Sequence, residues 1–72
     1  MKEYGKVEEY NGVYGTIKGN DGIDYTLLDK NIIDENVQEN VEVEFEKDNY
    51  RTVETEVNIA RFVRKRQYNN KQ

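Results

Sequence analysis

The segment Gly5–Ile17, which reads GKVEEYNGVYGTI, holds the residues with the clearest potential to bind a ligand. A short alternating strand leads into an Asn-Gly pair, a strong signal for a tight hairpin turn. A second strand follows, in which Tyr14 stands beside Gly15. Because Tyr14 has the opposite parity to Val13, we expect its ring on the outer face of a β-hairpin. A planar ligand such as a nucleobase could stack there; the alternative is an ordinary exposed tyrosine.

Other candidate binding residues lie around this hairpin and near the C-terminus. Tyr10 could offer a second ring, or it could pack on a neighbouring strand. Lys6 and Lys18 could contact phosphate, although surface lysines are most often simply solvated. The segment 61–68 interleaves basic and aromatic residues, a pattern that can bind RNA through charge and stacking. The alternative is a basic strand end that offsets an acidic body.

The composition argues against catalysis and metal binding. The 72 residues include no cysteine and no histidine, which excludes disulfides, thiolate or imidazole metal sites and the usual nucleophilic triads. Glu42, Glu44 and Glu46 alternate along one strand, and we interpret them as a solvated outer face. The acidic residues between positions 21 and 29 do not match a calcium-binding loop. We therefore expect no enzymatic activity, no metal and no cofactor.

Charge is distributed unevenly along the chain. Residues 1–60 contain six Lys/Arg and all fifteen Asp/Glu, whereas residues 61–72 contain five Lys/Arg and no acid. An acidic body weakens long-range attraction to phosphate but does not exclude nucleic-acid binding through local contacts. No apolar run approaches the roughly 20 residues of a membrane span, and no signal-peptide pattern precedes the first expected strand. We expect a cytoplasmic protein.

A period of two dominates the chain and indicates an all-β fold. We expect strands at 2–10, 13–18, 23–28, 41–46 and 52–63, with a hairpin turn at 47–50 and a loop with one helical turn at 29–40. Val53, Val57, Ile59 and Val63 share one parity and are expected to face the core. Five short antiparallel strands suit a closed barrel, because closure removes exposed edges. Residues 1–63 would form this domain, and residues 64–72 a basic, flexible and disordered tail.

At several positions the chain resembles the cold-shock domain family, whose fold is a five-stranded OB-fold barrel. The opening Gly5-Lys6-Val7 with Tyr10-Asn11 resembles the first strand of that family. Tyr14-Gly15-Thr16-Ile17 resembles its first RNA-binding motif, and Tyr25-Thr26-Leu27-Leu28 stands where the second would be. Segments 37–46 and 56–59 resemble its last two strands. The resemblance and the basic segment together nominate these nucleic-acid-binding residues: Lys6, Tyr10, Tyr14, Thr16, Lys18, Tyr25, Arg61, Arg64, Lys65 and Arg66.

The departures from the family pattern point to weak binding. Glu9, Thr16, Leu27 and Leu28 replace residues that are aromatic or histidine in the family. Each stacked base contributes about 1–3 kcal/mol, so the loss of several rings lowers affinity by orders of magnitude. Tyr25 has the same parity as Ile23 and Leu27, which leaves open whether it faces the ligand or the core.

These observations favour a weak, low-specificity protein that binds single-stranded RNA or DNA. The resemblance implies an RNA chaperone or modulator of gene expression, with no membrane and no small-molecule substrate. One alternative is a protein-interaction module built on a degenerate OB-fold. Another is a ribosome-associated factor that resembles bacterial initiation factor one.

Overall fold

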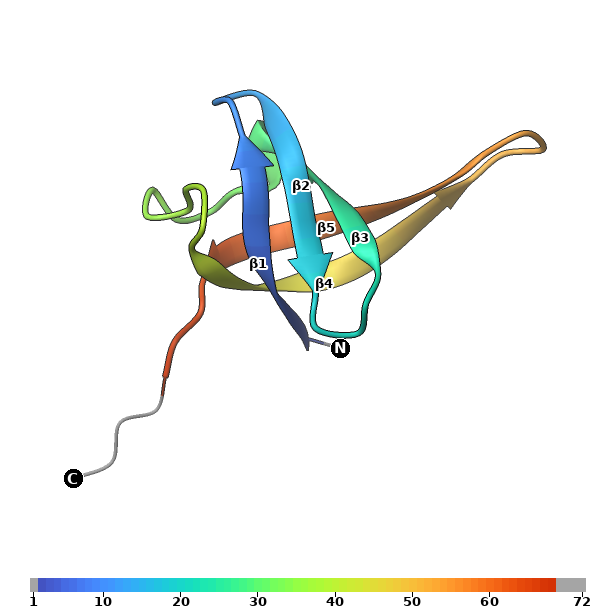
Figure 1. Ribbon diagram of the computed structural model, residues 1–72. Coiled ribbons are helices and arrows are strands. Elements are labelled where there is room, and N and C mark those ends of the chain that lie inside the picture. Colours follow the sequence, from blue (N-terminus) through green and yellow to red (C-terminus); the bar gives the residue numbers. More distant parts are fainter. Residues whose placement is uncertain (1, 69–72) are drawn as a thin grey trace.

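The computed structural model describes residues 2–68, which form a closed five-stranded β-barrel (Figure 1). Its strands are β1 (Lys2–Tyr10), β2 (Tyr14–Gly19), β3 (Asp24–Leu28), β4 (Glu42–Arg51) and β5 (Glu56–Lys65), with one short 3-10 helix, η1 (Asp29–Asn31), after β3. The strand order around the barrel is β1-β2-β3-β5-β4. Every pairing is antiparallel except that of β3 with β5. The expected all-β barrel of OB type is confirmed.

Alternating side chains from all five strands fill the barrel. The core consists of Val7, Ile17, Tyr25, Leu27, Val37, Val43, Phe45, Ala60 and Val63. Tyr25 and Phe45 are its largest members, and their rings meet edge to face with centroids 4.8 Å apart. Only Val37 comes from the loop between β3 and β4. Burial of these side chains supplies the main stabilisation of a domain of this size.

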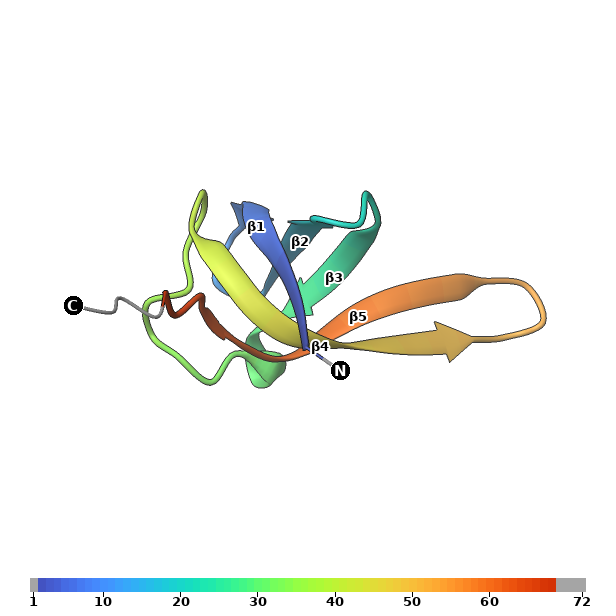
Figure 2. The same ribbon diagram turned by 90° about the horizontal axis from the view of Figure 1, so that it is seen from below.

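The β4–β5 hairpin extends well beyond the barrel, and the expected turn at 47–50 is wrong. Both strands continue as a two-stranded arm, and the turn lies at Thr52–Thr55 (Figures 1 and 2). Side-chain pairs stabilise the arm, including Asn49 with Asn58 at 2.9 Å and Arg51 with Glu56 at 3.1 Å. These cross-strand contacts favour continued pairing over an early turn.

Two further expectations about burial are wrong. Val53 lies at the tip of the arm and is fully exposed, and Val13 is 62% exposed in the β1–β2 loop. In β5, the alternation is interrupted because the pairing with β4 shifts by one residue between Glu44 and Glu46. This bulge directs Ala60 and Val63 into the core, and Val57 and Ile59 are only half-buried. Of the four residues expected to face the core from this segment, only Val63 does.

The expected boundary between domain and tail is also wrong for its first residues. Arg64 and Lys65 are the last two residues of β5 and pair with Glu44 and Val43. The Arg66 backbone N–H donates to the Glu42 carbonyl at 2.9 Å, which continues the β4 contact. Residues 69–72 of the expected tail lie outside the described residues. Within residues 2–68, no helix has the length and apolar character needed to cross a membrane.

Candidate nucleic-acid interface

The outer face of β2, β3 and β5 is the candidate interface. Gly15, Ile17 and Gly19 are buried, so the alternate residues of β2 point outward. Cross-strand pairing then places Tyr14 beside Leu28, Thr16 beside Thr26 and Lys18 beside Asp24, and Thr26 beside Ile59 of β5. We call this set the outer face: Tyr14, Thr16, Lys18, Asp24, Thr26, Leu28, Val57, Ile59 and Arg61. It joins one aromatic ring to a half-buried apolar centre and a few charged residues.

Tyr14 has the position that ligand stacking requires. It is the first residue of β2, and its side chain is 59% exposed. The Asn11 side-chain oxygen accepts hydrogen bonds from the backbone N–H groups of Val13 and Tyr14, at 2.9 and 3.0 Å. This asparagine turn, a common use of the residue, fixes the backbone that carries the ring. The expectation of an outward-facing ring is confirmed.

Tyr10 lies near Tyr14 but does not share its face. The β1–β2 pairing shifts between Val7 and Glu9, and Tyr10 then pairs with the buried Gly15. Its half-buried ring packs against the core. Tyr10 and Tyr14 line a shallow hollow of about 300 Å³ together with Glu9 and Glu39. The two carboxylates make the hollow acidic, which disfavours a phosphate there.

Tyr25 is a core residue and is not available to a ligand. Its ring is 1% exposed, and its hydroxyl donates to an Asp21 carboxylate oxygen at 2.7 Å. Burial, followed by this hydrogen bond, raises the pKa of Tyr25. The nomination of Tyr25 as a binding residue is therefore wrong. The physical reason is that Tyr25 and Leu27 both face inward, which leaves Asp24 in solvent and avoids an unpaired buried carboxylate.

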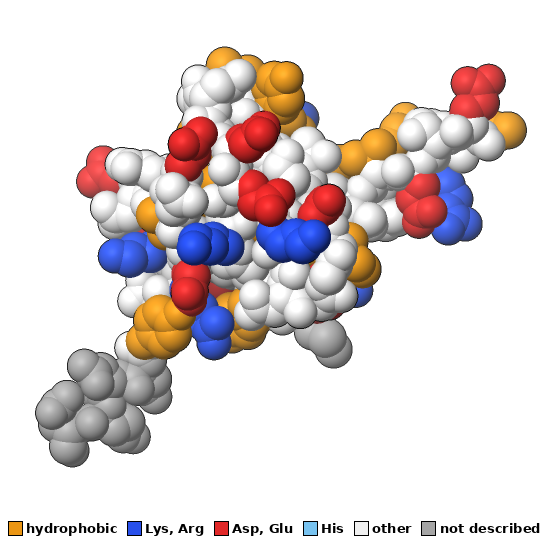
Figure 3. All heavy atoms as spheres, in the orientation of Figure 1, with side chains coloured by type: hydrophobic (Ala, Val, Ile, Leu, Met, Phe, Trp, Pro, Cys, Tyr) orange, Lys and Arg blue, Asp and Glu red, His pale blue; other side chains and the backbone are white. Residues whose placement is uncertain are grey.

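Most of the nominated basic residues are engaged within the protein. Lys18 forms an ion pair with Asp24 at 3.7 Å, and the Arg61 Nε lies 2.6 Å from an Asp48 oxygen. The hydrogen bond from Arg61 lowers the pKa of Asp48. Lys6 is exposed and pairs in register with Lys18, so these two lysines lie side by side. Figure 3 shows acidic and basic side chains mixed on the face formed by β1, β2 and β3.

Arg64, Lys65 and Arg66 lie away from the outer face. The Arg64 Nε donates to Glu44 at 2.9 Å, and the Lys65 backbone N–H donates to Asp34 at 2.9 Å. The Arg66 guanidinium lies over the Tyr4 ring at 4.3 Å and over the Tyr68 ring at 4.9 Å. The structure therefore does not bring these three residues to Tyr14. Arg61 alone among the nominated C-terminal basic residues belongs to the outer face.

Three residues have positions that the sequence alone did not predict. Glu44 is 4% exposed, so its assignment to a solvated face is wrong. Phe62 and Tyr50 are exposed aromatic side chains, on the bulge of β5 and on the arm. Strand parity could have placed Tyr50 if the true turn were known, but nothing local marks the bulge.

No known family model, curated protein or solved structure matches this chain.

Proposed function

We propose that this protein binds single-stranded RNA or DNA weakly and with little sequence preference, on the outer face of β2, β3 and β5. The exposed Tyr14 ring is the observation that carries the proposal. Aromatic side chains on a sheet surface stack bases without reading their identity. Thr16 and Thr26 lie beside each other next to this ring, where their hydroxyls could bond to sugar or base atoms.

The role that we propose follows from the resemblance to the cold-shock domain family. It is that of a cytoplasmic RNA chaperone or modulator of gene expression. The OB-type strand order supports this proposal, since such barrels commonly bind oligonucleotides on the face of their second and third strands. Fold alone does not determine function, so the weight rests on Tyr14 and its neighbours.

Electrostatics limits the expected affinity. Lys6 and Lys18 are the nominated cations at the outer face that could contact phosphate, because the Lys18–Asp24 ion pair, at 3.7 Å, is looser than the Arg61–Asp48 pair, at 2.6 Å. Two phosphate contacts on a single strand give a slope of about −1.4 for log K against log salt concentration. A slope much steeper than this would indicate that other basic residues take part.

Titration of the labelled full chain with a short oligo-dT, followed by amide NMR shifts at low salt, tests the proposal. We expect shifts at Tyr14, Thr16 and Thr26, and a 5- to 150-fold weaker affinity in Tyr14→Ala, which is about 1–3 kcal/mol. Tyr68→Ala is the matched control, since Tyr68 is also exposed but lies elsewhere. Unchanged spectra at millimolar oligonucleotide, or equal affinity of both variants, would refute base stacking on Tyr14.

A protein partner is the second candidate, and the acidic hollow beside Tyr14 favours it. Carboxylates of Glu9 and Glu39 beside the rings of Tyr10 and Tyr14 suit a Lys or Arg side chain, through ion pairing and cation–π contact. A basic peptide added in the same NMR titration distinguishes the two. Shifts at Glu9, Tyr10 and Glu39 with the peptide, and none with the oligonucleotide, would favour this candidate.

A further inference from the structure

Phe62 has a backbone conformation that its residue type disfavours. Its φ is 54°, in the left-handed region, and its ring is 58% exposed. Asn40 is the only other non-glycine residue of segment 2–68 with positive φ, and asparagine tolerates that region. For a bulky aromatic residue the conformation is a genuine outlier. Glycine would satisfy a bulge of this kind without strain.

Stability of the fold does not explain why position 62 holds a phenylalanine and not a glycine. The bulge turns Phe62 outward and directs the smaller Val63 into the core. Burial of the phenylalanine would remove more apolar surface from water than burial of the valine. Side chains held in strained conformations at bulges often belong to binding sites. The Phe62 ring is therefore a candidate for contact with a ligand.

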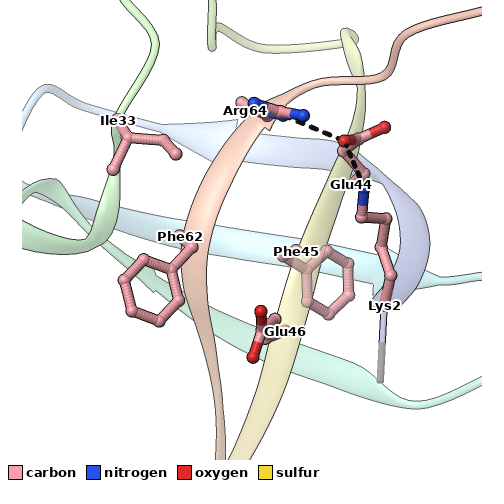
Figure 4. A pocket seen from close by; sticks show the side chains of 7 residues that line it. All are labelled: Lys2, Ile33, Glu44, Phe45, Glu46, Phe62 and Arg64. Atoms are coloured by element: carbon pink, nitrogen blue, oxygen red, sulfur yellow. Dashed lines mark hydrogen bonds and ion pairs between the residues drawn. The ribbon is translucent and has the colours of Figure 1, made fainter.

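Phe62 lines a cleft between β4, β5 and the loop that follows η1 (Figure 4). The cleft has a volume of about 200 Å³, which is too small for a drug-sized ligand but suits one side chain. Ile33 forms a second apolar wall. It is 58% exposed, and its backbone N–H donates to the Val63 carbonyl at 2.9 Å, which ties the loop to the bulge. We call this site the Phe62 cleft.

One end of the Phe62 cleft presents cations. Glu44 accepts hydrogen bonds from Lys2 at 3.0 Å and from Arg64 at 2.9 Å; its carboxylate lies between the two side chains, and the residue is 4% exposed (Figure 4). About half of each cationic side chain remains exposed. Arg64 uses only Nε in this bond, and its two terminal nitrogens make no hydrogen bond within the described residues. The guanidinium is thus held in place with donors free for an incoming carboxylate.

The rim of the Phe62 cleft also carries an anion. Figure 4 shows the exposed Glu46 carboxylate near the Phe62 ring, away from Arg64. The cleft therefore has a cationic end, an apolar middle and an acceptor on its rim. A peptide's last residue offers the complementary groups, namely a carboxylate, an apolar side chain and a backbone N–H.

We propose that the Phe62 cleft binds the C-terminal residue of a partner polypeptide. The bulky apolar side chain of this C-terminal residue packs against Phe62 and Ile33. The carboxylate of the same residue binds Arg64, and Lys2 adds a second positive charge. A C-terminal residue carries both groups on one Cα, which matches the small volume. A polyanion such as RNA fits less well, because Glu46 and the acidic body repel every additional phosphate. None of the residues that line this cleft belongs to the outer face, so the site is separate from that of Tyr14.

The test is an amide NMR titration of the full chain with the peptide acetyl-Gly-Ser-Gly-Leu, which has a free carboxylate. We expect shifts at Ile33, Phe62 and Arg64, and at least tenfold weaker binding of the amidated peptide and of a peptide ending in alanine. Equal binding of the amidated peptide would overturn the carboxylate assignment. Absence of shifts at millimolar peptide, or stronger binding of oligo-dT at the same residues, would overturn the proposal as a whole.

Variants of the chain separate binding from folding. Phe62→Gly relieves the backbone strain, so it should fold at least as well and lose at least tenfold in peptide affinity. Ile33→Ser changes an exposed residue and provides a second variant with the same expected loss. Arg64→Lys keeps the positive charge but removes the planar guanidinium with its several N–H donors. It should weaken the binding of the peptide with a free carboxylate more than the binding of the amidated peptide. Tyr14→Ala is the matched control and should bind the peptide normally; its failure to do so would contradict an independent site.

Discussion

The Glu44 carboxylate connects three distant parts of the chain. It accepts hydrogen bonds from Lys2 at the start of β1, from Arg64 near the end of β5, and from the Gln67 backbone N–H at 3.3 Å. Burial alone would raise the pKa of this carboxyl, but the hydrogen bonds from Arg64, Lys2 and Gln67 outweigh it and lower the pKa to about 2. Charge-assisted bonds of this kind are stronger than neutral ones.

Glu44→Gln should lower the free energy of unfolding at pH 7 by about 1–3 kcal/mol, since it leaves two cations without their anion.

The pH dependence of stability follows from the direction of the shift in the Glu44 pKa. The folded-state pKa is below the ordinary value of 4.5, so the unfolded chain binds the proton first as the pH falls. This contribution is complete above about pH 5 and is lost as the pH falls from 4.5 to 2. Urea unfolding at pH 7, 4 and 2.5 measures it, and the variant should show the flatter profile.

Gly15 is the second residue on which the barrel depends. A Cβ at this position would meet the backbone of β1, with the Glu9 carbonyl carbon and the Tyr10 Cα both at 2.8 Å. The close approach occurs beside the β1 irregularity that turns Tyr10 inward. Side-chain atoms cannot be accommodated there unless the two strands separate.

Gly15→Ala should therefore destabilise the protein by about 2–3 kcal/mol. Gly12→Ala is the matched comparison, because Gly12 has a φ of 96° but open space around it. It should cost only about 1 kcal/mol, from backbone strain. Thermal unfolding of both variants, followed by circular dichroism, checks the order. A larger loss for Gly12→Ala would contradict the packing argument.

At the scale of elements, the β4–β5 arm is separate from the barrel core. Every core residue lies outside positions 47–58. The arm exposes Tyr50 on the side that it shares with Val57, its cross-strand partner, whereas the opposite side is held by the polar contacts of Asn49. An isolated two-stranded ribbon is only marginally stable in water. The arm therefore derives its order from the strands of the barrel that it continues.

Replacement of residues 49–58 by Asn-Gly should leave the barrel folded. Asp48 and Ile59 are paired in register, in the same hydrogen-bonding phase as Thr52 and Thr55, so a two-residue turn of type I′ can connect them directly. We expect a change in the free energy of unfolding of less than about 1 kcal/mol, because no core contact is lost. The amide spectrum of the core residues provides the measurement. Widespread loss of dispersed signals would show that the arm is required for folding.

At the scale of the whole molecule, the basic C-terminal segment is part of the barrel's stabilisation. Arg64 and Gln67 bind Glu44, and Arg66 lies over Tyr4. The Tyr68 hydroxyl donates to Glu42. The uneven charge along the sequence thus becomes a set of contacts between the acidic body and the segment 64–68. This use of the cations leaves few for phosphate, which is why the proposed nucleic-acid affinity is low.

A chain that ends at Val63 should lose about 2–4 kcal/mol of stability, since Glu44 would lose two of its three hydrogen-bond donors and β4 would lose its pairing with Arg64 and Lys65. For a domain of this size, the loss corresponds to roughly 10–25 °C in melting temperature. A chain that ends at Tyr68 retains these contacts and serves as the control. Calorimetry of both chains provides the measurement, and equal melting temperatures would contradict a structural role for residues 64–68.

Local pattern was sufficient for the barrel and for the outward position of Tyr14. Alternation of side chains along a strand is a property of the backbone, so Ile17, Val43 and Phe45 could be assigned to the core from their spacing alone. The absence of cysteine and histidine likewise excludes whole classes of site without any structure. The family resemblance and the function that it implies remain predictions from sequence.

Only the tertiary structure decided which charges are buried and where the strands shift. Glu44 has the same local pattern as Glu42, yet it alone is covered by groups 42 residues before it and 20 after it. The bulge at Phe62 and the turn at Thr52–Thr55 depend on the register between β4 and β5. The register of a hairpin is set by the side-chain patterns of both strands together and by the turn that joins them. A pattern read along one strand therefore cannot reveal it, and the Phe62 cleft could be found only in the folded protein.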